Sequence, residues 1–180
     1  METLAAEVYG SQASAVRIGA AAREDAAKAE MGKYRVLHFA THGVLNDRNP
    51  LYSYIVFAYN GDSNEDGLLE AWEIMGMELN ANMAVLSACD SARGRVGAGE
   101  GLIGMTWALF VAGVPTTVAS QWAVPSNTTA KLMVAFHENA KSVSKAEAFR
   151  QAALQMIKDQ RFRIKPYYWA GFVVVGDGGM

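Results

Sequence analysis

Met83-Ala84-Val85-Leu86-Ser87 places four apolar side chains on consecutive positions and ends at a serine. Consecutive apolar residues are typical of a strand that is covered on both faces, as in parallel sheets flanked by helices. The stretch therefore predicts a buried strand of an α/β protein.

Further strand-like runs lie on either side of this stretch, and helical stretches separate them. The predicted strands are 34–39, 54–58, 114–119 and 172–175, and the predicted helices are 13–30, 68–75, 102–111, 126–140 and 144–159. Helix 102–111 is apolar nearly all round, so we expect it to be buried. The alternation predicts a mostly parallel sheet with helices on both faces and a functional site at the carboxyl ends of its strands.

Length and composition limit the classes of protein. The chain has 180 residues, 51% of them hydrophobic, which suits a single domain over 1–180. Its net charge of −2 gives no basic footprint for nucleic acid, and no apolar run reaches the roughly 18 residues of a membrane-spanning helix. Only residues 7–9 look strand-like before Gly10, and this abrupt start predicts a domain cut from a longer protein. We expect a cytoplasmic protein.

Cys89 is the single cysteine, so no intrachain disulfide or four-cysteine zinc site can form. It follows the buried strand, whereas His42-Gly43 follows strand 34–39, and neighbouring parallel strands would bring both to one edge. An imidazole beside a thiol is the minimum for a cysteine nucleophile. The N–H groups of Gly43 and Cys89 are then candidate oxyanion donors. The spacing of 47 positions is close to the caspase-type value of about 50.

Structural roles compete with these chemical ones. A lone cysteine is usually a small buried hydrophobe. His38 lies inside a predicted strand and is better interpreted as a packed, hydrogen-bonded histidine, whereas His137 next to Glu138 is expected on the surface. No histidine or carboxylate cluster has metal-ligand spacing, so neither a metal nor a cofactor is expected.

Residues 94–104 are rich in glycine, and Gly99-x-Gly101-x-x-Gly104 matches a dinucleotide-binding pattern. The preceding strand ends too far upstream, and no acidic residue follows at the required distance, so we disfavour nucleotide binding. Two compatible interpretations remain open. The glycines form a loop that leads to Glu100 in the first turn of a helix, and this loop borders the Cys89 pocket and shapes substrate access.

Four aromatic residues lie between the predicted strands 114–119 and 172–175: Trp122, Tyr167, Tyr168 and Trp169. Packing is the favoured role for such residues, and Trp122 is also a candidate for the wall of the pocket.

The sequence resembles the CHAT proteases, relatives of caspases, separases and metacaspases. The matching blocks are residues 38–43, 86–91, 99–101, 112–115, 120–124 and 166–172, in the order of the family. The resemblance implies a caspase-like three-layer sandwich, cysteine endopeptidase chemistry with His42 and Cys89 as the dyad, and frequent attachment to tetratricopeptide repeats or other sensor modules. It also implies that this chain is mainly the catalytic C-terminal part of a longer protein.

Two departures concern specificity. Ser87-Ala88-Cys89 replaces the caspase Gln-Ala-Cys, so aspartate-directed cleavage is not carried over. Ser126 stands where separase-like relatives have an acidic residue that receives arginine, which predicts a weaker preference for a basic residue before the cut. A helix N-cap is the competing role of Ser126.

These observations predict a cysteine endopeptidase that acts on a protein or peptide substrate and is regulated by a partner or sensor module. Asp90, Glu100, Trp122 and Ser126 are the candidates for the substrate cleft. The alternative is a noncatalytic caspase-like module that binds a partner, which is disfavoured because both members of the dyad are present.

Overall fold

A four-stranded sheet forms the centre of the computed structural model, which describes residues 2–10, 12–61, 64–87 and 100–179. The strand order is β1-β5-β6-β7. Strands β1 (Val36–Phe39), β5 (Met83–Leu86) and β6 (Thr116–Ser120) are parallel, and β7 (Phe172–Gly176) runs antiparallel to β6. The prediction of a mostly parallel sheet is confirmed, and all four residues of β5 are buried.

A small antiparallel sheet lies beside the central one. Its strands, in the order β2-β3-β4, are β2 (Gly43–Val44), β3 (Tyr54–Val56) and β4 (Leu68–Glu70). Strand β2 begins directly after His42, so this sheet is an extension of the carboxyl end of β1.

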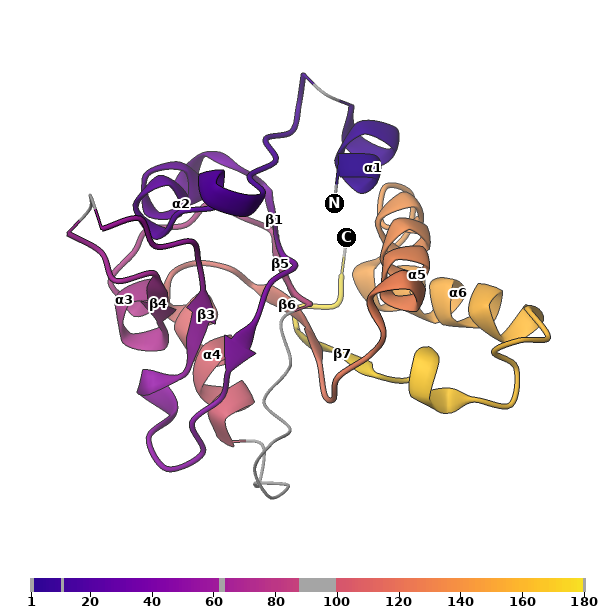
Figure 1. Cartoon of the computed structure of the whole chain (residues 1–180). Coiled ribbons are helices and arrows are strands. Elements are labelled where there is room, and N and C mark those ends of the chain that lie inside the picture. The colour runs from indigo at the N-terminus through magenta and orange to yellow at the C-terminus, as the bar shows by residue number, and fades with distance from the viewer. Residues whose placement is uncertain (1, 11, 62–63, 88–99, 180) are drawn as a thin grey trace.

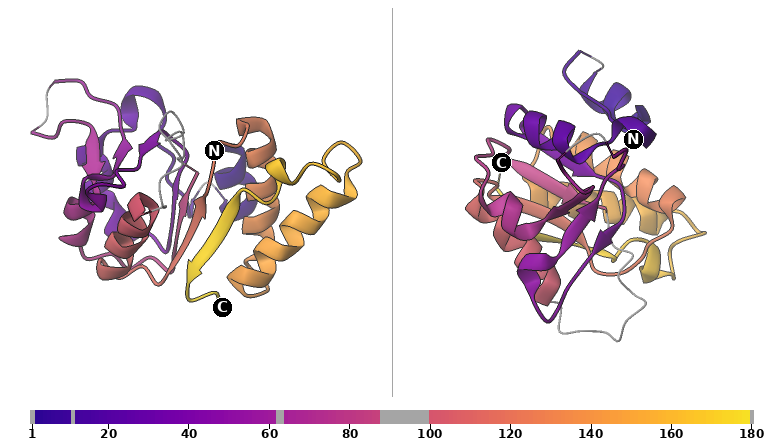
Figure 2. Two further views of the ribbon diagram at one scale, coloured as in Figure 1. Left: turned by 90° about the horizontal axis from the view of Figure 1, so that it is seen from below. Right: turned by 60° about the vertical axis from the view of Figure 1, so that its left-hand side comes forward.

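Helices cover both faces of the central sheet (Figures 1 and 2). On one side lie α3 (Ala71–Met75) and α4 (Glu100–Val111) with the small sheet, and on the other lie α5 (Ser126–Asn139) and α6 (Lys145–Lys158). At the N-terminus, α1 (Glu2–Leu4) and the π-helical turn η1 (Ala5–Tyr9) contact α5. The remaining elements are α2 (Glu24–Glu30) and the 3-10 turns η2 (Gly19–Ala21), η3 (Met31–Lys33), η4 (Pro50–Tyr52) and η5 (Pro166–Tyr168).

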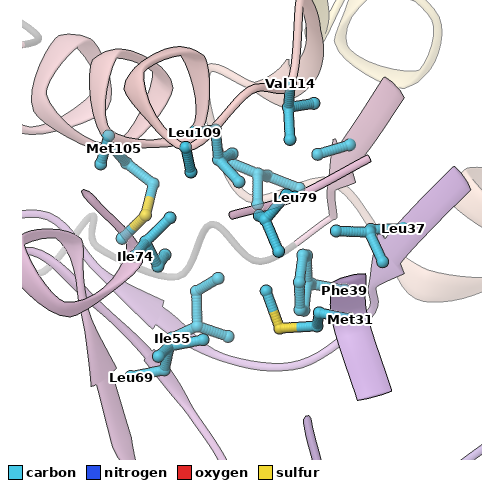
Figure 3. Packing of buried hydrophobic residues seen from close by; sticks show 14 of the residues in the cluster. Met31, Leu37, Phe39, Ile55, Leu69, Ile74, Leu79, Met105, Leu109 and Val114 are labelled. Carbon is cyan, nitrogen blue, oxygen red and sulfur yellow. The ribbon is translucent and has the colours of Figure 1, made fainter. Parts of the chain in front are cut away.

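Alternate residues of the strands point to two separate apolar cores, one on each face of the sheet. Leu37 and Phe39 of β1 enter the first core, where Figure 3 shows them with residues of α3, α4 and the small sheet. Val85 and Val118 enter the second, which contains the buried faces of α5 and α6. The protein is therefore a three-layer α/β sandwich.

Several predicted elements were wrong in detail. The alanine-rich stretch 13–30 forms a helix only over its last part, α2. Residues 68–70 form β4 before α3 begins, because they pair with β3 in the small sheet. Residues 7–9 belong to η1 rather than to a strand, because Val8 packs on the buried face of α5.

Helix α4 was expected to be buried, but only one of its faces is. Met105 and Leu109 pack into the first core, whereas Ile103, Trp107 and Phe110 are more than half exposed. The prediction was wrong because α4 covers an outer face of the sheet and nothing in the described part of the chain lies over its other side. The apolar character of α4 on its outward face therefore has no role in the core.

Candidate active site

The carboxyl ends of three parallel strands meet at one edge of the central sheet. Phe39, the last residue of β1, pairs with Leu86, the last residue of β5, which in turn pairs with Ala119 of β6. His42 follows Phe39 by three positions and is exposed. Cys89 follows Leu86 by the same three positions, but Cys89 and Asp90 lie outside the described residues, as the chain is described only up to residue 87 on this side.

A cleft of about 730 Å³ opens at this edge of the sheet. This volume lies in the range of typical ligand pockets. Its walls come from the strand ends, from the N-terminal helix and from one side of α5. The cleft is lined by Leu4, His38, Ala40, Thr41, His42, Ser87, Ser120, Val124, Ser126, Thr129, Ala130, Lys131, Met133, Val134, Ala135, Glu138 and Phe172. The structure thus places His42 and Ser126, two residues selected from the sequence, on one cavity.

The backbone beside His42 is held by the small sheet. The Val56 N–H donates to the His42 carbonyl at 2.8 Å, and the Thr41 hydroxyl donates to the Val56 carbonyl at 2.8 Å. Residues of an antiparallel pair alternate between hydrogen-bonded and non-bonded positions. Because the ladder bond runs through His42, the N–H of the next residue, Gly43, points away from β3.

Trp122 takes a packing role in the described structure. Its ring stacks on Tyr167, with ring centroids 6.4 Å apart, and its Nε1–H donates to the Tyr167 carbonyl at 3.1 Å. Gly171 lies under this ring, where a Cβ would come within 3.2 Å of Trp122 Nε1. Trp122 is not among the described residues that line the cleft. Glu100 is the first residue of α4, and its side chain is outside what the structure describes.

Of the residues of α5 that line the cleft, only Ser126 was selected from the sequence. Ser126, Ala130, Val134 and Glu138 all line the cleft. These residues recur every four positions, so they lie along one face of the helix. This spacing is the signal that marks α5 in the sequence, although it does not show what the face borders.

The two remaining histidines form a pair behind the cleft. His38 Nδ1 lies 3.1 Å from His137 Nε2, and the rings stack with centroids 5.2 Å apart. The prediction of a packed, hydrogen-bonded His38 is confirmed. The prediction that His137 is on the surface was wrong, because its place on α5 faces β1 and its side chain is fully buried.

Burial keeps both imidazoles neutral. Desolvation, with the nearby His137 as a smaller cause, lowers the pKa of His38 to about 3. Desolvation lowers the pKa of His137 to about 4 and raises the pKa of the Tyr9 phenol to about 12. Near neutral pH each imidazole therefore has one N–H and one free lone pair.

Three carboxylates gather on the other side of the molecule, within reach of a common centre: Glu24, Glu65 and Glu73. The ammonium of Lys28 lies among them, 2.7 Å from Glu24 and 2.6 Å from Glu73. The three carboxylates hold its pKa well above the usual range, whereas desolvation acts in the opposite direction. In this structure the cluster is an ion-pair network that ties α2 to α3.

Among the described residues, no helix is both long and apolar enough to span a bilayer.

The sequence is similar to a known protein family and to curated proteins. The sequence profile of the CHAT domain matches residues 2–177. Tetratricopeptide repeat protein 28 of Mus musculus is 30% identical over 109 residues, which is 61% of this chain. The Homo sapiens protein of the same name is 28% identical over 109 residues. The chain spans about 4% of the length of each of these relatives. Since the profile covers nearly the whole chain, the protein belongs to the CHAT domain family, whose fold is caspase-like.

Proposed function

We propose that this protein is a cysteine endopeptidase that cleaves peptide bonds in a protein substrate, with Cys89 as the nucleophile and His42 as the acid and base. One observation carries the proposal: an exposed His42 lines a cleft of about 730 Å³ at the carboxyl edge of the sheet. The register of β1 with β5 supports the assignment, because His42 and Cys89 follow a paired Phe39 and Leu86 by equal numbers of residues.

The chemistry needs only these two side chains and two backbone donors. The Cys89 thiolate attacks the scissile carbonyl while the imidazolium of His42 gives its proton to the leaving amine, which leaves a thioester. Water then attacks the thioester, His42 takes a proton from that water, and the thiol and the new carboxyl group are released. The N–H groups of Gly43 and Cys89 stabilise the oxyanion of both steps. The direction of the Gly43 N–H away from β3 is consistent with that role.

The cleft suggests a substrate with an uncharged side chain before the cut. Ser126 lines the cleft without a negative charge, and most of the neighbouring lining residues are small or apolar. We therefore propose that arginine and lysine are less favoured at that position than in relatives with an acidic residue in place of Ser126. Asp90, Glu100 and Trp122 remain candidates for the substrate cleft.

A tetratricopeptide repeat module is the proposed regulatory partner. Both curated relatives are named for such repeats, and the matched region is a small part of each. Repeat arrays offer extended surfaces for partner binding. In this proposal the module senses a partner and controls the activity of the CHAT domain.

A thiol-directed probe tests the dyad first. The single cysteine gives one labelling site, so the labelling rate reports on Cys89 alone. A thiol activated by an imidazole should react faster in the native protein than in denaturant, and His42→Ala should remove the difference. Equal rates in native, denatured and His42→Ala protein would favour the noncatalytic partner-binding alternative.

Cleavage of a peptide library then tests the activity. Wild-type protein, with and without a tetratricopeptide repeat partner, is compared with Cys89→Ala, His42→Ala and the matched control Ser142→Ala at a distant exposed turn. We expect Cys89→Ala to abolish cleavage, His42→Ala to slow it by roughly a hundredfold or more, and Ser142→Ala to have no effect. Cleavage that survives Cys89→Ala would sink the proposal.

A further inference from the structure

Four polar side chains connect the N-terminal segment to the cleft. The Tyr9 hydroxyl lies 2.7 Å from His137 Nδ1, and His137 Nε2 lies 3.1 Å from His38 Nδ1. His38 Nε2 then lies 3.0 Å from the Ser87 hydroxyl oxygen. We call these residues the Tyr9–Ser87 chain. It crosses the second core of the molecule between η1, α5, β1 and the end of β5.

The protons of this chain must all point the same way. Each neutral imidazole donates from one nitrogen and accepts at the other. One proton lies between His38 and His137, so fixing the direction of one link fixes the others. In one direction, Tyr9 donates to His137, His137 donates to His38, and His38 donates to Ser87. In the other direction, Ser87 donates to His38, His38 donates to His137, and His137 donates to Tyr9.

The distances favour donation from Tyr9 toward Ser87. Hydroxyl donors make shorter hydrogen bonds than N–H donors, whose usual separation from oxygen is about 2.9–3.0 Å. The 2.7 Å link at Tyr9 has the length of a hydroxyl donor, and the 3.0 Å link at Ser87 has the length of an N–H donor. A phenol is also the more acidic hydroxyl of the two, and it stays protonated here because burial raises the pKa of Tyr9 to about 12.

In this direction the Ser87 hydroxyl accepts a hydrogen bond from His38, so its own proton is available for donation to another acceptor. Among the described residues, His38 is the hydrogen-bond partner of this hydroxyl, and Ser87 lines the cleft. The backbone of Ser87 is held in place, because its N–H donates to the Phe39 carbonyl at 2.9 Å. Accepting a hydrogen bond polarises a hydroxyl and strengthens it as a donor.

We infer that Ser87 is a substrate-binding residue whose hydroxyl accepts from His38 Nε2–H and donates to a carbonyl oxygen of a peptide in the cleft. The substrate in this inference rests on the proposed function, whereas the direction of the Tyr9–Ser87 chain does not. His38, His137 and Tyr9 act through Ser87 and are positioning residues.

Nuclear magnetic resonance tests the direction without any substrate. Chemical shifts of the imidazole nitrogens, measured at pH 7 on the whole ¹⁵N-labelled chain, distinguish the Nε2–H from the Nδ1–H tautomer. We expect His38 and His137 both to carry the proton on Nε2. Tyr9→Phe keeps the ring and removes the donor, so it should let His137 populate the Nδ1–H tautomer. An Nδ1–H tautomer of either histidine in the wild-type protein would overturn the inference.

Kinetics on the best-cleaved library peptide test the role of the hydroxyl. A lost hydrogen bond worth about 0.5–1.5 kcal/mol predicts that Ser87→Ala raises KM by roughly two- to tenfold with little change in kcat. Ser87→Thr keeps a hydroxyl and should restore most of the affinity, and Tyr9→Phe should raise KM by less than Ser87→Ala. An unchanged KM in Ser87→Ala overturns the inference. If no peptide is cleaved by any form, the proposed function fails, while the tautomers still decide the direction of the chain.

Discussion

Lowering the pH from 7 to 5 should destabilise the native protein through its buried imidazole pair. Both pKa values lie below the ordinary value of 6.5, at about 3 for His38 and about 4 for His137, because burial disfavours the charged form. In this range the unfolded chain binds protons on these histidines and the native protein does not. Stability is therefore complete above about pH 6.5, falls as the pH decreases, and levels off near the native pKa values.

The size of the effect follows from the distance between pH 5 and the unfolded pKa. That distance is 1.5 units, which corresponds to about 2 kcal/mol for each histidine and about 4 kcal/mol for the pair. The value for His137 is the better founded of the two because its side chain is fully buried, whereas His38 lines the cleft and is partly exposed. The total is a large part of the 5–15 kcal/mol that stabilises a typical domain.

Urea unfolding followed by tryptophan fluorescence at pH 7 and pH 5 measures this loss. His137→Gln removes one imidazole and should reduce the pH-dependent loss by about 2 kcal/mol relative to wild type. Tyr9→Phe keeps both imidazoles and should show the wild-type pH dependence, although the phenol and Lys141, whose Nζ lies 5.8 Å from the centroid of the Tyr9 ring, border the pair. Hydrogen bonds from Arg150 and Arg161 lower the pKa values of Glu147 and Asp159 to about 2, so these carboxyl groups act only at lower pH. Equal pH dependence in wild type and His137→Gln would refute the reasoning.

Three further substitutions test the packing and the ion pairs by the same unfolding measurement. Gly104→Ala places a Cβ about 2.4 Å from the Cβ of Pro50 and should cost roughly 1–3 kcal/mol, so unchanged stability would show that this close approach does not exist. Lys28→Met removes the ammonium that pairs with three carboxylates and should cost roughly 3–5 kcal/mol at pH 7 and less at pH 5, because burial raises the pKa of the Glu24 carboxyl; a loss independent of pH would contradict the network. Ser144→Ala removes the side chain that accepts from the N–H of the third residue of α6 and should cost about 1 kcal/mol, whereas Ser142→Ala should be nearly neutral; equal losses would argue against the cap.

The parallel strands were predictable because local pattern and burial agree in them. The apolar run at β5 could be identified from the sequence because a strand covered on both faces has apolar residues at every position. Helix α6 was equally clear, because Ser144 marks its first turn and its side chain does cap the helix. His42 could be selected because it follows such a strand.

The features that the sequence did not reveal depend on contacts between distant residues. Leu68–Glu70 has no strong strand pattern, and it forms β4 because β3 lies beside it. His137 looks like a surface residue next to Glu138, but its burial is decided by β1 and η1, which are about a hundred positions or more away. Gly104 matched a nucleotide pattern, whereas the structure accounts for it by the close passage of Pro50.

The division into two cores places the cleft on one side of the central sheet. Nearly all the side chains that line the cleft come from the strand ends and from the α5 side of the sheet, while α3, α4 and β3 contribute none of the described lining. Substitutions at the cleft-lining positions of α5 can therefore change the shape and charge of the cleft without disturbing the first core. Under the proposed function, a lineage could acquire new targets by varying one helix, while the opposite layer would keep the strand ends, and with them His42, in register.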